Sequence, residues 1–263
     1  MNTYRLALGV TTVALALSGC GFVGGARDTS ALGDRPATPE KSPREVLIET
    51  VPDEKVGAYT FDIKGGMSPF SGLLDAPNRT AQVKVTHAED GVSLTLHALI
   101  IKNKSWMKLS VTGAPEGFPR LPKKWMLIDP KKIKDPDDAP LSYNDDEIDP
   151  GYTELIIRNS QDVVETGKGR YAGTTDLTGA KAAEIVDEKT LTALGEQAKS
   201  VPFDAVVGPE GHLTSLTVKI PATGGSTAST YKVTYAGYGR TKTPTVPAET
   251  SRPTATVYEL LNS

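Results

Sequence analysis

The chain has 263 residues and a formal net charge of −3, with 38% hydrophobic residues and a single cysteine. The slight excess of acidic residues argues against nucleic acid as a partner, because such partners select basic surfaces. One cysteine excludes an internal disulfide, and the length allows one domain with a substantial core or two small ones.

Residues 1–19 have the pattern of a secretory signal peptide. Arg5 precedes the uncharged run of residues 6–16, which as a helix would be about 16 Å long against the ~30 Å of a bilayer core. Such a run is too short to span comfortably and suits the apolar region of a signal peptide.

The string Leu17-Ser18-Gly19-Cys20 resembles the lipobox of bacterial lipoproteins. The resemblance implies cleavage after Gly19, acylation of Cys20, and a protein held by lipid on the outer face of the cell membrane. Two or three acyl chains would anchor firmly, since each buried methylene contributes ~0.8 kcal/mol. The alternative is an ordinary secretory signal with an accidental cysteine.

Residues 20–44 are rich in Gly, Pro, Ser and Thr without periodicity and are expected to form a flexible tether. The folded domain is expected over residues 45–240. Residues 241–263 form a Thr- and Pro-rich C-terminal segment, for which partial order is expected.

The clearest pattern is a three-stranded antiparallel meander within residues 80–113. Asp90-Gly91 separates two alternating runs, as in a two-residue hairpin turn. This turn predicts that Val83 faces Ala98 and that Val85 faces Leu96. A second turn at Asn103-Lys104 predicts further cross-strand pairs, namely Met107 with Ile100, Leu109 with Ala98 and Val111 with Leu96. Both turns place the same apolar residues on one face.

Further strands are predicted at residues 58–64, 124–129, 169–177, 202–207, 213–220 and 231–238. Helical patterns are limited to residues 43–49, 153–159 and a longer segment from Thr178 to about residue 201. Few helices separate the strands, so an α+β fold with an antiparallel sheet is expected.

The chain resembles the LppX/LprG/LolA-like lipoproteins, known from actinobacteria among other groups. The lipobox and tether, "KKWMLID", "ETGKGRYAGTTDL", and "VPFDAVVGPEGHLTSLTVKI" followed by "YKVTYAGYG" carry the resemblance, which spans roughly residues 45–239. The acidic insert at residues 135–149 departs from the family pattern.

The resemblance implies a curved antiparallel sheet, an open half-barrel wrapped around a few helices, with an apolar cavity that holds acyl chains of a lipid or lipoglycan. Its lining is expected on the meander's apolar face, with residues 181–198 opposite: Val83, Val85, Leu94, Leu96, Ala98, Ile100, Met107, Leu109 and Val111. The alternative for the same residues is a packed core without a cavity.

No catalytic, cofactor or metal site is expected. His87, His97 and His212 are far apart in the sequence, and the familiar hydrolase, metalloprotease and nucleotide-binding motifs are missing. The insert carries seven carboxylates, which could bind calcium or simply be solvated. The neighbouring basic stretch, residues 120–134, could contact anionic lipid head groups or neutralise the insert.

Two functions of different classes follow. The first is a membrane-anchored carrier of a hydrophobic ligand. The second is a non-enzymatic lipoprotein that modulates a membrane partner, such as a sensor kinase or transporter, without binding lipid.

Replacement of Cys20 by serine is expected to abolish acylation and to leave the chain uncleaved after Gly19, because the lipoprotein peptidase requires the thioether-modified residue. The mature mass and membrane fractionation measure both effects. Unchanged mass and fractionation, with the substitution and with globomycin alike, would contradict the lipoprotein interpretation.

Overall fold

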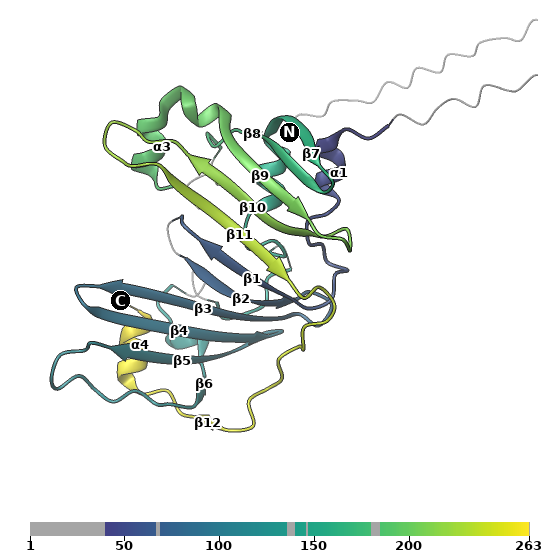
Figure 1. The fold of residues 1–263 in the computed structure, drawn as a ribbon. Coiled ribbons are helices and arrows are strands. Elements are labelled where there is room, and N and C mark those ends of the chain that lie inside the picture. The colour runs from purple at the N-terminus through teal and green to yellow at the C-terminus, as the bar shows by residue number, and fades with distance from the viewer. Residues whose placement is uncertain (1–39, 67–68, 136–139, 146, 180–184, 263) are drawn as a thin grey trace, which may run out of the picture. The chain divides into compact units, whose positions relative to one another are not determined.

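The computed structural model describes residues 40–66, 69–135, 140–145, 147–179 and 185–262. The predicted signal peptide, Cys20 and most of the predicted tether therefore lie outside the described residues. Twelve strands form one curved sheet that does not close, with a few short helices (Figure 1). The expected α+β class and open curved sheet are confirmed, although the sheet is mixed because one short strand pair is parallel.

Two runs of antiparallel strands build the sheet. The first run comprises β1 (Tyr59–Lys64), β2 (Phe70–Asp75), β3 (Thr80–Glu89), β4 (Val92–Ile101), β5 (Lys104–Thr112) and β6 (Trp125–Leu127). The second comprises β7 (Ser160–Gly167), β8 (Arg170–Thr175), β9 (Val201–Val207), β10 (Leu213–Ile220) and β11 (Ser229–Ala236). The two runs meet where β1 pairs with β11, and β12 (Thr250–Ser251) runs parallel to β6 at one edge.

Within the described residues, six short helical segments accompany the sheet. They are α1 (Pro43–Ile48), the 3-10 turn η1 (Pro130–Lys132), α2 (Thr153–Arg158), α3 (Glu188–Leu194), the 3-10 turn η3 (Gly195–Ser200) and α4 (Ala255–Leu261). The helices predicted at residues 43–49 and 153–159 are present. β2, β7, β12 and α4 were not predicted as elements.

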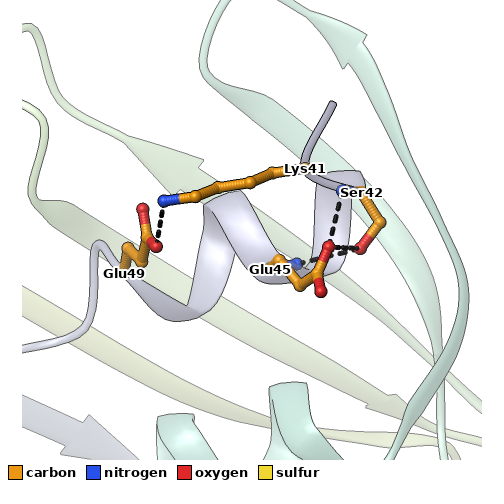
Figure 2. Close-up of polar contacts among 4 residues, drawn as sticks. All are labelled: Lys41, Ser42, Glu45 and Glu49. Atoms are coloured by element: carbon orange, nitrogen blue, oxygen red, sulfur yellow. Dashed lines mark hydrogen bonds and ion pairs between the residues drawn. The ribbon is translucent and has the colours of Figure 1, made fainter. Parts of the chain in front are cut away.

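Local side-chain bonds fix the start of α1. The Ser42 hydroxyl accepts from the Glu45 amide at 3.3 Å, while the Glu45 carboxylate accepts from the Ser42 amide at 2.7 Å (Figure 2). This reciprocal capping box satisfies two amides that the first helical turn would otherwise leave unpaired. Lys41 pairs with Glu49 across the same helix. The sequence thus sets the beginning of α1 locally, and its Leu47 is fully buried.

The meander of β3, β4 and β5 confirms one predicted register and corrects the other. Val83 faces Ala98 and Val85 faces Leu96, as expected from the Asp90-Gly91 turn. Across the second turn, however, Ala98 faces Met107 rather than Leu109. The turn centres on Lys102-Asn103, where Lys102 has φ 57°. The observed pairing of β5 with β4 is shifted by two residues from the predicted one. Every side chain still lies on its predicted face of the sheet, because side chains alternate between the two faces with a period of two.

Two apolar clusters cover the face that bears Phe61, Val83, Ala98 and Met107, called the inner face below. The larger cluster joins β1, β8, β9, β10 and β11 to α1, α2 and α3. The smaller cluster joins β4, β5 and β6 to α4, whose Val257 is fully buried. On the opposite face Trp106 is only 5% exposed.

The long helical prediction is only partly correct within the described residues. The Thr178 amide donates to the Asp176 carboxylate at 2.8 Å, and residues 180–184, on which a helix starting there depends, lie outside the described residues. The helix α3 begins after Asp187, whose carboxylate accepts from the Thr190 amide at 2.9 Å. Asp187 thus offers a cap directly before the apolar residues Leu191 and Leu194 of α3.

Replacement of Gly91 by valine is expected to destabilise the fold by about 1–2 kcal/mol. Gly91 has φ 81° next to Asp90 at φ 48°, and a side chain there would meet no atom within 4 Å. The whole cost should therefore be conformational. Chemical denaturation measures it, and Gly91→Asn serves as the control because asparagine tolerates positive φ. Equal losses in both variants would contradict this account.

Candidate functional site

The segment that connects the two runs of strands crosses the inner face. We call residues 140–145 and 147–152 the crossing segment. One end is held at two neighbouring turns. The Tyr143 amide donates to the Lys102 carbonyl of the β4–β5 turn at 2.7 Å, and Arg79 of the β2–β3 turn pairs with Asp145 at 2.8 Å. The other end leads directly into α2. The segment is therefore fastened to the sheet at both ends.

Three tyrosines from the two central strands hold the second end. Tyr59 of β1 donates to the Ile148 carbonyl, and Tyr231 of β11 donates to the Gly151 carbonyl at 3.1 Å. Tyr235 donates to the Asp149 carboxylate. All three rings are buried, and Tyr59 meets Tyr235 edge-on with ring centroids 5.7 Å apart.

Glycine at position 151 permits this close approach. A Cβ atom there would lie 2.5 Å from a methyl group of Val233 and 2.9 Å from the Tyr235 hydroxyl. Any larger residue would push the crossing segment away from β11.

Asp149 is the hub of these contacts. Its carboxylate also accepts from the Thr153 hydroxyl at 3.0 Å and from the Glu154 amide at 2.7 Å. Burial raises the pKa of this carboxyl, and the hydrogen bonds from Tyr235, the Glu154 amide and Thr153 oppose that rise. The carboxylate thus joins α2 to β11 through the crossing segment.

Two hollows lie on the inner face. The first, called the loop hollow, has a volume of about 530 Å³ and lies between the first run of strands and the crossing segment. Its lining comprises Phe61, Phe70, Leu74, Ala81, Val83, Ile100, Pro140, Ser142, Tyr143, Asn144, Glu147, Asp149, Pro150 and Tyr152. Its floor is apolar, while its polar side chains come from the crossing segment.

The second hollow, called the helix hollow, lies between the meander and α4 and has a volume of about 230 Å³. It is lined by Leu94, Leu96, Met107, Leu109, Ile133, Pro140, Leu260 and Leu261. None of these side chains is charged. Pro140 lines both hollows, so the two are neighbours along the inner face.

A third hollow of about 580 Å³ lies on the far side of the crossing segment. It is called the acidic hollow, and α1, α2 and residues 51–54 complete its wall. Its carboxylates are those of Asp53, Glu54, Asp145, Glu147, Asp149 and Glu154. It shares Glu147, Asp149 and Tyr152 with the loop hollow.

The structure distributes the nine proposed lining residues over three environments. Val83 and Ile100 line the loop hollow, and Leu94, Leu96, Met107 and Leu109 line the helix hollow. Ala98 is 1% exposed within the smaller cluster and lines neither. Val85 and Val111 are partly buried and also line neither hollow.

The helix packed against Leu94, Leu96, Ala98, Met107 and Leu109 is α4 rather than the described part of the predicted segment 181–198, whereas Val83 and Ile100 belong with the larger cluster. Val257, Leu260 and Leu261 pack on the β4–β5 side, whereas Leu194 and Ala198 belong to the larger cluster. Polar contacts fix α4 to η1: the Asp129 amide donates to Tyr258 at 3.1 Å and the Lys134 amide to Asn262 at 2.8 Å. The apolar spacing within residues 255–261 was the signal that could have revealed α4.

One polar group in the wall of the loop hollow lacks a hydrogen-bond partner. Tyr143 is 7% exposed, and its hydroxyl is buried without a partner. Burial, with the carboxylates of Asp145 and Asp75 nearby, raises the pKa of Tyr143 to about 12. The hydroxyl is therefore neutral at physiological pH.

The histidines and the acidic insert form no metal site within the described residues. His87 faces Leu94 on the inner side of the sheet and is exposed beside Glu89, because it lies at the solvent-exposed end of β3. His97 lies on the outer face, where partial burial and then Lys84 and Lys108 lower its pKa. His212 stacks on Tyr238 with ring centroids 4.6 Å apart.

Comparison of the chain with protein-family models and with curated proteins yields no match. Within the described residues, every helix is too short or too polar to cross a membrane. The site must therefore be interpreted from its own geometry.

Asp149 predicts a specific pH dependence of stability. The folded-state pKa of Asp149 lies above the ordinary value of 3.8. The folded protein therefore binds this proton more tightly than the unfolded chain, and the resulting stabilisation of the fold is complete below about pH 3.8. It is lost as the pH rises through the raised folded value. The stability of wild type relative to Asp149→Asn should therefore fall as the pH rises from about 3.8 towards neutrality.

Urea denaturation of both proteins over this pH range measures the difference. Glu249→Gln is the control, since Glu249 is an exposed residue that pairs with Lys124 at 2.7 Å. A difference that grows in favour of wild type with rising pH would contradict the assignment.

Proposed function

We propose that this protein is a lipoprotein, anchored through acylated Cys20 on the outer face of the cell membrane, that binds the acyl chain of a hydrophobic ligand on its inner face. The resemblance to LppX/LprG/LolA-like proteins suggests this function, and no enzymatic role is proposed. The observation that carries it is the pair of neighbouring hollows along the apolar residues of β1–β5.

The chemistry of the two hollows supports an extended apolar chain. The floor of the loop hollow includes Phe61, Val83 and Ile100, and Pro140 connects it to the wholly uncharged helix hollow. Burial of each methylene there would contribute ~0.8 kcal/mol. The volumes of about 530 Å³ and 230 Å³ are in the range of small-molecule sites when taken together.

The alternative, a lipoprotein that modulates a membrane protein without binding lipid, has one observation in its favour. Ala98, at the centre of the expected lining, is fully packed in the smaller cluster with α4. If the hollows take no ligand, the inner face serves only as a core. Native mass spectrometry of the gently extracted protein distinguishes the two functions, because co-purified lipid supports the carrier and a clean apo mass supports the alternative.

Replacement of Val83 by tryptophan should fill part of the loop hollow. Since Val83 is only partly buried and faces that hollow, stability is expected to change by less than about 1 kcal/mol. The affinity for an uncharged fluorescent long-chain probe should fall at least tenfold. Thermal melts and probe titration measure the two effects.

Val164→Trp is the matched control, because Val164 is 53% exposed on the edge strand β7. This control should bind the probe as the wild type does. If the wild type fails to bind the probe, or Val83→Trp binds it equally well, the carrier function is wrong.

A further inference from the structure

We infer that the ligand of the inner face is an amphiphile whose polar end carries a positive charge, held beside Glu147 at the mouth of the loop hollow. This inference rests on the proposed function, since it names the class of ligand for the same site. It is argued from the distribution of charge around the three hollows.

Carboxylates, and no basic side chains, line the loop and acidic hollows. Lysine, arginine and histidine contribute nothing to the described lining of either, whereas Glu147 and Asp149 contribute to both. The polar wall of the loop hollow therefore presents hydrogen-bonding groups and negative charge. An anionic head group placed there would face repulsion without a counter-charge.

The carboxylates around the loop and acidic hollows differ in whether they already have an ion pair or hydrogen bonds with other residues. Asp145 pairs with Arg79 at 2.8 Å, Glu154 pairs with Arg158, and Asp149 accepts from Tyr235, Thr153 and the Glu154 amide. Glu147 has no ion-pair partner among the described residues and is exposed. It is thus the carboxylate of the loop hollow that is available to a ligand cation.

The apolar residues of the two hollows determine the direction in which the tail of the ligand would extend. From Glu147, a chain can lie over Phe61 and Val83, pass Pro140 and enter the helix hollow, whose lining is uncharged. A head group at Glu147 keeps its charge at the solvent-exposed end of this path. The polar end and the apolar end of the site therefore match the two ends of a cationic amphiphile.

A ligand with an anionic head group could bind in the opposite direction, and this is the competing possibility that the experiment must exclude. Lys132 and Lys134 flank Ile133, which lines the helix hollow. An anionic head group could therefore approach from that side with its tail in the loop hollow. The Lys132 ammonium already lies 5.2 Å from the centre of the Tyr258 ring, whereas the Lys134 side chain is exposed.

Two fluorescent probes with the same tail test the inference, one a long-chain primary amine and the other the corresponding fatty acid. We expect the full chain to bind the amine at least tenfold more tightly than the acid at pH 7.5 and low salt. Added salt should reduce this preference, because Glu147 is exposed. In Glu147→Gln, the preference should fall to about threefold or less.

Glu249→Gln is the control for a general change in net charge and should retain the full preference. If the acid binds as tightly as the amine or more tightly, or if Glu147→Gln retains the preference, the inference is wrong while the carrier function stands. If neither probe binds, and the uncharged long-chain probe also fails, the proposed function itself is wrong.

Discussion

The pairing of β1 with β11 is the constraint on which the rest of the structure depends. It is the one ladder that joins the first run of strands to the second, and it places Phe61 beside Tyr235. The same two strands carry the tyrosines that hold the crossing segment, with Asp149 as the central acceptor. A buried carboxyl is costly unless it is well bonded, so each contact at this junction supports the others. Loss of the junction would separate the two halves of the sheet and release the segment that forms the wall of the loop hollow.

An open sheet leaves two edges, and both are poorly suited to pairing with another chain. At one edge β12 contains only two residues. At the other, the pairing of β7 with β8 is interrupted at two places, and Asp162 has φ 52°. Irregular or short edge strands discourage further strand addition. The sheet thus stays unclosed without offering long regular edges for aggregation.

Elements defined by local turn chemistry were predictable from the sequence, and those defined by distant contacts were not. Asp90-Gly91 determined the β3–β4 register, and the inner-face residues remained correct even where the second turn was misplaced by one residue. β2 was missed because Gly72 interrupts its pattern; a Cβ there would lie 2.7 Å from the Phe61 ring, so tertiary packing explains the glycine. Asp149 could not be distinguished from the other carboxylates of the insert, since its burial depends on Tyr235, 86 positions further along the chain. The helix α4 was obscured by the Thr- and Pro-rich residues that precede it.

The position of α4 connects the packing of the inner face with its proposed use. Its apolar side chains fill the β4–β5 side around Ala98, and the polar contacts of Tyr258 and Asn262 go to residues beside η1. The packing of Val257, Leu260 and Leu261 in the smaller cluster is apolar and non-directional, and such contacts adapt to a change of neighbour more readily than hydrogen bonds with fixed geometry. The crossing segment is held in the opposite way, by directed bonds to buried groups. A ligand tail entering the helix hollow would therefore meet a wall that can adjust, while its polar end would lie against a segment whose backbone is bonded at Tyr143, Ile148 and Gly151. Such an arrangement would tolerate variation in the tail and discriminate at the head group.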